Sequence, residues 1–148
     1  MAASTPEAVV LRRQALTLLD HLLALPAPDE GCALLLGERR GGSWWVERIW
    51  PCLNVWEPAA ERRRRFAVDP REQLRAQTWA RGRGWQLLGA AHSHPHSPPL
   101  PSASDRELTL APALMLIRGV GAGGAPELAC WWLVEEGPAQ PLVWRMED

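Results

Sequence analysis

The sequence predicts an α/β fold in a single domain over residues 1–148, with a mixed, curved β-sheet flanked by helices. Helix-capping patterns alternate with short apolar runs along the chain, which is the first indication of mixed structure. The length is that of one compact domain, which buries roughly two thirds of its unfolded surface. Apolar residues make up 47% of the chain and include nine tryptophans, so the composition is that of a folding protein.

The first helix is predicted from Ser4 to about Pro26. Ser4-Thr5-Pro6-Glu7 has the pattern of a capping box with proline in the first turn. Apolar residues between Val10 and Leu23 then recur at spacings that place them on one helical face. Next come two apolar runs, residues 32–36 and 43–54, which a glycine-rich turn separates. We expect these runs to form a β-hairpin.

A second helix is expected from Asp69-Pro70-Arg71-Glu72, which combines a cap residue, a proline and an acidic residue at the third helical position. Gly82 and Gly84 end it. The following run, residues 85–94, is apolar with small residues and predicts a buried central strand that ends at three histidines. The later elements are a proline loop, a helical turn from Ser102, a strand over 113–120, a glycine turn, and a hairpin of 127–137 and 141–147.

Charge and cysteine content exclude several classes of protein. All sixteen basic residues are arginine and nearly balance seventeen acids, so the net charge of −1 gives no electrostatic case for nucleic acid or an anionic membrane. Three cysteines without a close CxxC pair favour reduced thiols over a disulfide framework. The apolar N-terminal run carries arginines, Asp20 and His21, so it resembles neither a signal peptide nor a membrane span. We expect a cytoplasmic protein.

The histidines at the end of the predicted central strand suggest a metal site. Side chains at i and i+2 of a strand share a face, so His92 and His94 can aim both imidazoles at one point. Asp105 is the first acid downstream and could be the third ligand, leaving a fourth position for water. Ser102-x-x-Asp105 has the spacing of a helix cap, which would fix the carboxylate. HxH alone is more often a pair of surface histidines, and the proline loop here would be a stiff connector.

The full pattern, His92-x-His94, seven residues, Ser102-x-x-Asp105, resembles the JAMM signature of the MPN-plus zinc metallopeptidases. An upstream segment, PDEGCALLLG, is similar to the family's glutamate and the strand after it, with Glu30 as the glutamate. Asn54, the RFAVDP stretch and GAAHSHP are further family-like features, so the resemblance covers about residues 1–118. It implies the MPN (deaminase-like) fold and a JAMM/MPN-plus metallopeptidase domain over 1–148.

The resemblance also implies the roles of individual residues. His92, His94 and Asp105 would bind one Zn²⁺ per chain, and Glu30 would be the general base outside the ligand shell. Ser102 would donate a hydrogen bond to the oxyanion that forms at the attacked carbonyl. The alternative for Ser102 is a purely capping role, and the sequence does not decide between the two.

The implied activity is that of a zinc metallopeptidase that cleaves a peptide or isopeptide bond after the tail of a ubiquitin-like protein. Single-domain prokaryotic members act on ubiquitin-like sulfur carriers whose tails end in Gly-Gly, and the short chain resembles these. The alternative is a non-catalytic MPN scaffold that retains the metal site. A nucleoside deaminase is disfavoured because the H-x-E and P-C-x-x-C elements are missing, and HExxH is missing as well. Whether the chain forms a homo-oligomer stays open.

Five other features have ordinary structural interpretations, and some of them have functional alternatives. His96 lies past Pro95 and is expected at the surface or the substrate rim, and His21 is expected on the surface of the first helix. Cys32 is expected to be a buried free thiol, although it lies two residues from Glu30. The run Arg62–Arg65 is usually a solvated loop, with binding of an acidic partner as the alternative. The tryptophans come in adjacent pairs, 44/45 and 131/132, so one of each pair should face the core.

Overall fold

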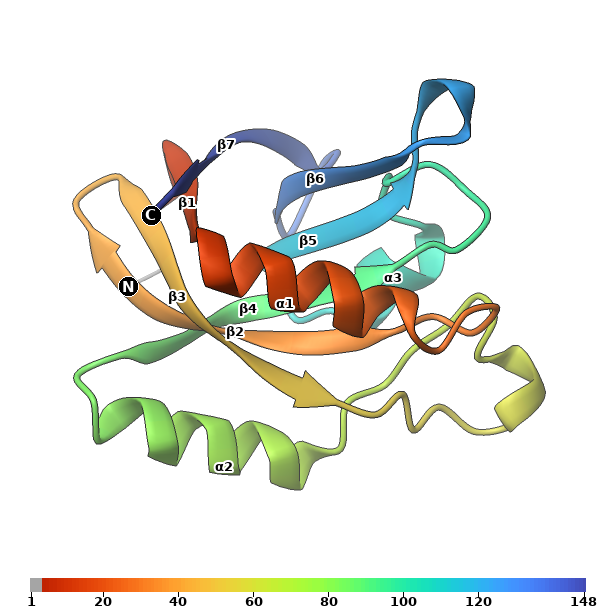
Figure 1. The fold of residues 1–148 in the computed structure, drawn as a ribbon, viewed down its shortest axis with the longest axis horizontal. Coiled ribbons are helices and arrows are strands. Elements are labelled where there is room, and N and C mark those ends of the chain that lie inside the picture. Colours follow the sequence, from red (N-terminus) through yellow and green to blue (C-terminus); the bar gives the residue numbers. More distant parts are fainter. Residues whose placement is uncertain (1–3) are drawn as a thin grey trace.

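The computed structural model describes residues 4–148, in which seven strands and three α-helices form one α/β unit (Figure 1). The elements in chain order are β1 Ala8–Arg12, α1 Arg13–Ala24, β2 Cys32–Arg40, β3 Ser43–Cys52, α2 Pro70–Arg81, β4 Gln86–Ser93, α3 Ala103–Leu108, β5 Ala113–Val120, β6 Pro126–Leu133 and β7 Gln140–Glu147, with short 3-10 turns at Ala59–Glu61 and Ala122–Gly124.

The sheet is mixed, as predicted, but it closes on itself. The strand order is β1-β3-β2-β4-β5-β6-β7, and β7 pairs in parallel with β1 to complete a barrel. The expectation of a simple curved sheet is therefore corrected. The closing pair, which begins at Ala8 opposite Val143, joins the two ends of the chain. Pairing over such a sequence distance leaves no local signal in either strand.

The start of the first predicted helix is also corrected. Ala8–Arg12 forms strand β1, and helix α1 begins only at Arg13 without a side-chain cap. The apolar residues Val9, Val10 and Leu11 are fully buried because β1 lies between β3 and β7. Their spacing suits a helix, but pairing with two neighbouring strands determines the conformation.

The remaining elements agree with the sequence interpretation. Both predicted hairpins form as antiparallel pairs, β2 with β3 and β6 with β7. Helix α2 starts at its proline, and the Asp69 side chain accepts a hydrogen bond from the Arg71 amide. Of the paired tryptophans, Trp44 and Trp132 are buried and meet edge to face with ring centroids 5.3 Å apart. Three cysteines of the described chain are free thiols.

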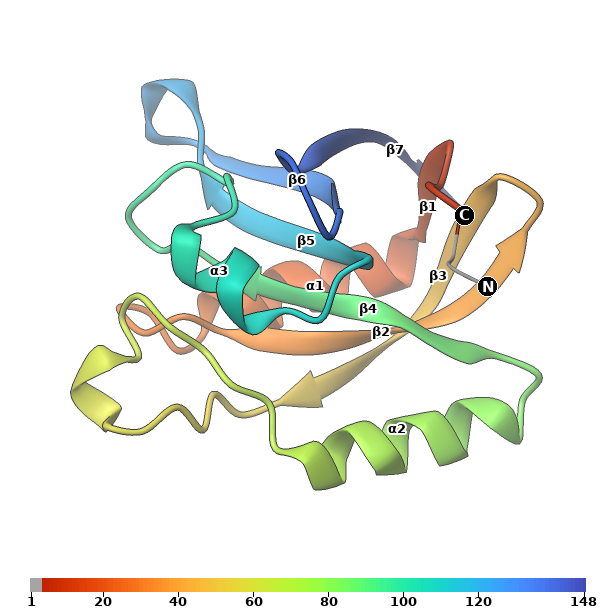
Figure 2. The same ribbon diagram turned by 180° about the vertical axis from the view of Figure 1, so that it is seen from behind.

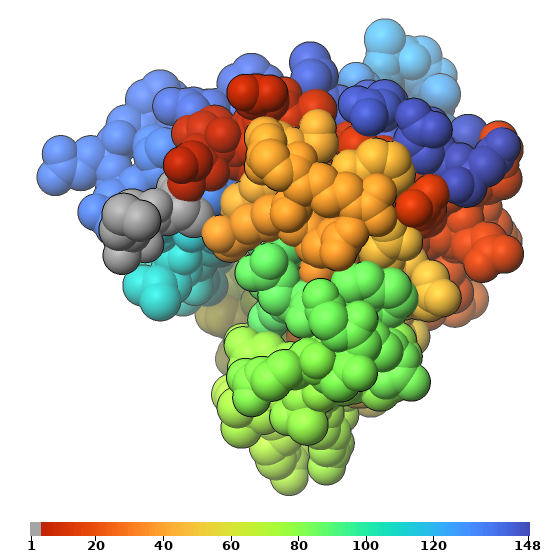
Figure 3. Space-filling view, turned by 90° about the vertical axis from the view of Figure 1, so that its left-hand side faces the viewer, coloured from red at the N-terminus to blue at the C-terminus, as the bar shows by residue number. Residues whose placement is uncertain are grey.

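Two layers of apolar packing hold the sheet. Ala33 and Leu35 of β2 join the main core under α1, whereas Leu34 and Leu36 pack with Ala76 and other residues of α2 on the opposite side. A strand that is covered on both faces explains the unbroken apolar run of β2. Figure 2 shows α1 and α2 on different sides of β2 and β4. Figure 3 shows the end where the tip of the β2–β3 hairpin lies above the C-terminal end of α2.

Strand β4 contains a bulge that affects the placement of its histidines. Leu88 and Ala91 lie in the main core, whereas Leu87 and Ala90 lie in the α2 cluster. A regular strand alternates strictly, so this pattern requires one extra residue. The register between β2 and β4 does shift between Leu35 and Leu36. The bulge therefore decides which face the residues at the end of β4 present.

None of the helices within residues 4–148 combines the length and hydropathy that crossing a membrane requires.

Gly89 allows the close approach of β4 to β5, and replacing it tests this packing. A Cβ at Gly89 would lie 2.4 Å from the Leu114 carbonyl oxygen. We expect Gly89→Ala to lower the free energy of unfolding by about 1–3 kcal/mol, as overpacking does, measured by urea denaturation. Gly82→Ala is the matched control, because a Cβ there meets no atom closer than 3.5 Å. Equal losses in the two variants would contradict the packing argument.

Candidate metal centre

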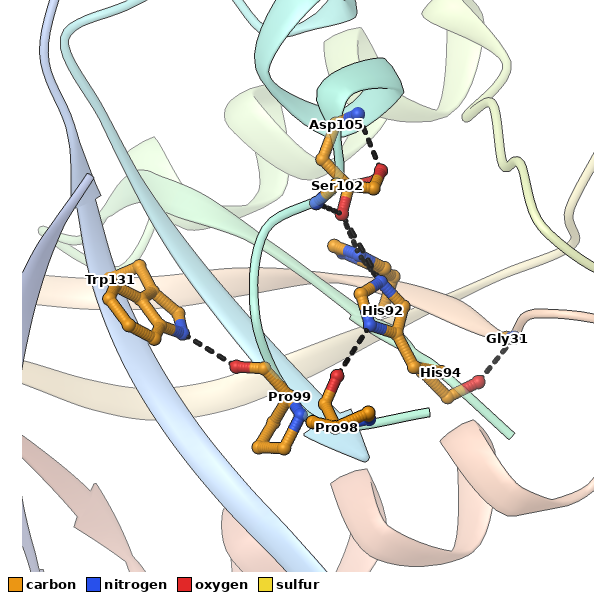
Figure 4. A network of polar contacts seen from close by, with 9 residues as sticks. Gly31, His92, His94, Pro98, Pro99, Ser102, Asp105 and Trp131 are labelled. Carbon is orange, nitrogen blue, oxygen red and sulfur yellow. Dashed lines mark hydrogen bonds and ion pairs between the residues drawn. The ribbon is translucent and has the colours of Figure 1, made fainter. Parts of the chain in front are cut away.

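The end of β4 brings two imidazoles together. His92 is the second-last residue of β4, and His94 is the first residue after the strand. Both side chains are buried. Their Nε2 atoms lie 3.1 Å apart. The expectation that this His-x-His pair points at one place agrees with the structure (Figure 4).

Helix α3 adds a carboxylate to the same place. Ser102 caps the helix: its Oγ accepts a hydrogen bond from the Asp105 amide at 3.0 Å, and its own amide donates to Asp105 Oδ2 at 2.9 Å. This capping box holds the carboxylate still. Asp105 Oδ2 then lies 3.0 Å from His92 Nε2 and 3.2 Å from His94 Nε2.

Two side chains fix the proline loop between β4 and α3 by hydrogen-bonding its backbone carbonyls. His94 Nδ1 lies 2.9 Å from the Pro98 carbonyl oxygen, and Trp131 Nε1 donates to the Pro99 carbonyl at 2.8 Å (Figure 4). A carbonyl oxygen only accepts, so the hydrogen in the first contact belongs to His94 Nδ1. The loop thus sets the tautomer of His94 as well as the position of α3, and it serves as the stiff connector expected from its prolines.

Glu30 completes the group from the segment before β2. Its side chain is buried, and the ligand atoms of Glu30, His92, His94 and Asp105 all lie within 4.8 Å of one another. Glu30 Oε1 is buried without a hydrogen-bond partner. A buried carboxylate oxygen in that state is costly unless water or an ion satisfies it.

The donor set fits a zinc ion. Because His94 Nδ1 carries the hydrogen, the Nε2 atom of a neutral His94 has a bare lone pair, 3.2 Å from an oxygen of Asp105 that also carries only lone pairs. Two such atoms repel each other unless a proton or a metal cation lies between them. The three atoms form a triangle with sides of 3.0–3.2 Å, close to the roughly 3.3 Å spacing that tetrahedral ligands about 2.0 Å from zinc would have.

The electrostatics of two ligands also suit metal binding. Burial lowers the pKa of His92, so the imidazole is neutral. For Asp105 burial alone would raise the pKa, but the hydrogen bonds from His92 and His94 outweigh it and hold the pKa well below its usual range. For His94 burial lowers the pKa, but contacts with Asp105 and the Pro98 carbonyl raise it more. Metal ligands must be unprotonated, so zinc would displace a proton here.

Other residues singled out in the sequence lie at different places. His96 and His21 are exposed, and Cys32 is a buried thiol opposite His92 in the β2–β4 pair but outside the group of four. In the arginine run, Arg62 pairs with Glu57 and Arg65 with Glu61, whereas Arg63 and Arg64 are exposed.

Two residues near the centre have roles that the sequence did not indicate. The Phe66 ring stacks on His92 with centroids 4.4 Å apart and an interplanar angle of 20°. Asn54 hydrogen-bonds the carbonyl of Glu30 at 3.0 Å. Both lie in segments that resemble the family, but resemblance gave no partner for either side chain. A polar residue at the end of the predicted strand run 43–54 was the only local signal for Asn54.

Glu30 gives the metal-free protein a specific pH dependence. Burial raises its pKa from 4.5 to about 8, with His94 opposing the change and Asp105 adding to it. The folded state therefore keeps a proton that the unfolded state loses above about pH 5, so this contribution to stability falls as pH rises toward 8. We expect Glu30→Gln to gain stability relative to wild type over this window, by at most about 1.4 kcal/mol per pH unit.

Thermal melts of the two chelator-treated proteins from pH 5 to pH 8 measure this gain. A difference in melting temperature that stays constant across the range would show that Glu30 titrates normally.

Comparison with known proteins agrees with this geometry. The family model described as prokaryotic homologs of the JAB domain matches residues 12–134. A desampylase of Haloferax volcanii is 38% identical over 80 residues, which are 54% of this chain and 54% of the relative. The chain thus aligns with about half the length of that curated relative.

Two solved structures share the fold. The solution structure of a protein from Desulfitobacterium hafniense has a TM-score of 0.83 and 30% identity, covering 95% of this chain and 93% of the other. A Salinibacter ruber protein has a TM-score of 0.60 and 29% identity, covering 87% and 88% of the two chains. Because the family model matches most of its length, the chain belongs to the prokaryotic JAB domain family, as the His-x-His and Ser-x-x-Asp pattern indicated.

Proposed function

We propose that the chain is a zinc-dependent metallopeptidase that cleaves a peptide or isopeptide bond after the C-terminal tail of a ubiquitin-like protein. The observation that carries this proposal is the contact between His94 Nε2 and Asp105 Oδ2 at 3.2 Å, two atoms without a hydrogen between them in the neutral tautomer. With His92 Nε2 at similar distances, one metal cation would satisfy all three atoms at once, which a single proton would not.

Zinc held by three side chains and open at a fourth position polarises a carbonyl and lowers the pKa of a coordinated water toward neutrality. Glu30 is the general base of the proposal: it accepts a proton from the attacking water and returns it to the leaving amine. In the metal-free protein burial raises the pKa of Glu30 to about 8, and a bound cation would favour the carboxylate form that accepts the proton.

Ser102 is the proposed donor to the oxyanion. Its Oγ accepts a hydrogen bond from the Asp105 amide at 3.0 Å, which occupies a lone pair and leaves the hydroxyl hydrogen free. Capping and oxyanion stabilisation are therefore chemically compatible in one serine. The hydrogen bond it would donate is of a kind that contributes about 3 kcal/mol to the transition state.

A groove beside the centre offers room for an extended chain. It has a volume of about 660 Å³ and includes Asp105 in its lining. Most of its apolar lining comes from three regions, namely the segment 66–68, the strand residues 87–90 and the segment 108–115, and Leu34 and Trp56 add to it. A mostly apolar groove that has Asp105 in its lining suits the flexible tail of a substrate better than a folded surface does.

The proposed substrate class comes from the relatives. The curated relative is named a desampylase, and this chain matches 54% of its length. We propose a ubiquitin-like protein of the sulfur-carrier type as the partner, with its tail in the groove and its scissile bond at the metal centre.

The metal ligands can be tested one at a time. We expect the purified protein to bind about one zinc per chain, and Asp105→Asn to lower zinc affinity at least about tenfold, because only the carboxylate is a ligand. Ser102→Ala should retain zinc within about threefold. Competition with a chromophoric chelator measures both affinities. Equal losses in the two variants would remove Asp105 from the ligand set, and a wild-type protein that takes up no zinc would remove the metal centre.

Glu30→Gln separates catalysis from metal binding. The amide has nearly the same shape but cannot carry a proton, so we expect turnover to fall about 10²–10⁴-fold with zinc content unchanged. The substrate is a ubiquitin-like sulfur carrier with a peptide extension after Gly-Gly, and mass spectrometry follows release of the extension. Unchanged turnover would exclude Glu30 as the base. A zinc-loaded wild-type protein that binds the carrier but cleaves nothing would favour the non-catalytic scaffold.

A further inference from the structure

We propose that Asn54 is a positioning residue of the metal centre, which fastens the loop 55–67 so that this loop holds Glu30 and His92 in place. The inference rests on the proposed catalytic role of Glu30. Asn54 supplies no ligand atom and does not itself line the groove, although it hydrogen-bonds the amides of Trp56 and Ala67, which do. Any effect of Asn54 on catalysis must therefore pass through the residues that it holds.

The amide of Asn54 uses its full hydrogen-bonding capacity. Its Nδ2 donates to the Glu30 carbonyl at 3.0 Å and to the Arg65 carbonyl at 2.9 Å. Its Oδ1 accepts from the amides of Trp56 at 3.1 Å and Ala67 at 3.2 Å. An asparagine side chain offers two donor hydrogens and two acceptor lone pairs, so four well-directed contacts saturate it. One side chain thereby joins the start of the loop, its end and the segment before β2.

The fastened loop reaches the metal centre at two points. The Arg62 carbonyl accepts a hydrogen bond from the Glu30 amide at 2.7 Å, so the backbone of Glu30 is held by its N–H and, through Asn54, by its carbonyl. Phe66 stacks on His92. His92 Nδ1 is buried without a hydrogen-bond partner, so the ring lacks the usual second contact that orients a metal-binding histidine. Stacking by Phe66 takes the place of that contact.

The chemistry of the four contacts explains why asparagine is required. Aspartate would keep the two acceptor contacts, lose both donated hydrogen bonds and place a negative charge against the carbonyls of Glu30 and Arg65. Alanine would lose all four contacts. A second backbone contact, from the Val55 amide to the Ala67 carbonyl at 3.0 Å, would still close the loop, so both variants should fold with the loop loosened.

Limited trypsin digestion tests the loop without any activity assay. Arg62–Arg65 places four trypsin sites in the fastened segment. We expect Asn54→Ala and Asn54→Asp to raise the rate of first cleavage at these arginines about tenfold or more, since local opening controls cleavage in a folded protein. Hydrogen exchange of the Glu30 amide should accelerate with it. If both rates stay at wild-type values, the proposal is overturned, whatever the enzyme does.

Kinetics then separate positioning from mere stability. A misplaced base lowers kcat up to about 10²-fold, so we expect kcat to fall 10- to 100-fold for Asn54→Asp, with zinc content within about threefold of wild type. Val9→Ala is the control, because Val9 is fully buried in β1, which pairs with Ser43–Val46 at the other end of β3. It should lower the melting temperature and leave kcat unchanged.

The outcomes are distinguishable from failure of the proposed function. A loosened loop with unchanged kcat would make Asn54 a structural residue only and would sink the positioning role. If the wild-type protein cleaves no substrate, the peptidase proposal fails, and digestion and exchange still decide whether Asn54 holds Glu30.

Discussion

The rest of the structure depends on one constraint: three buried polar atoms, His92 Nε2, His94 Nε2 and Asp105 Oδ2, meet within 3.0–3.2 Å of one another. In water each of these groups would be solvated separately. Burying them together costs free energy, which a shared cation or proton offsets. Glu30 adds a fourth buried polar group whose Oε1 has no partner. These buried polar groups therefore lower the stability of the folded protein, which is typical of a functional site.

Rigid backbone elements supply the precision that the centre needs. The bulge of β4 sets the face of the two histidines, and the capping box of α3 fixes Asp105 through Ser102. The carbonyls of Pro98 and Pro99 hold the connecting loop between β4 and α3. Asn54 does the corresponding work for the segment of Glu30. Apart from the bulge, each support is a hydrogen bond between backbone and side chain, and none of them involves a metal.

The sequence predicted the elements that depend on contacts between neighbouring residues, and it failed where an element depends on contacts with strands distant in the sequence. The hairpins, α2 with its Asp69 cap and the strand Ala113–Val120 depend on neighbouring residues, and their prediction was correct. The strand Ala8–Arg12 was wrongly predicted as helix because its partners, β3 and β7, are distant in sequence. Closure of the barrel was missed for the same reason.

The site shows the same division. His92, His94 and Asp105 lie within fourteen residues, so alternation along a strand and a helix cap suffice to bring them together in principle. Glu30 entered only through the resemblance to a family, since sixty residues separate it from the histidines. The partners of Asn54 come from positions 30, 56, 65 and 67, and no local pattern encodes such a set.

X-ray absorption at the zinc edge of the zinc-loaded protein tests most directly whether His92, His94 and Asp105 hold the metal. We predict a shell of nitrogen and oxygen atoms at about 2.0–2.1 Å, two of them from imidazole rings. A sulfur scatterer at about 2.3 Å would contradict the account, because it would place Cys32 or Cys52 in the ligand shell instead of Asp105.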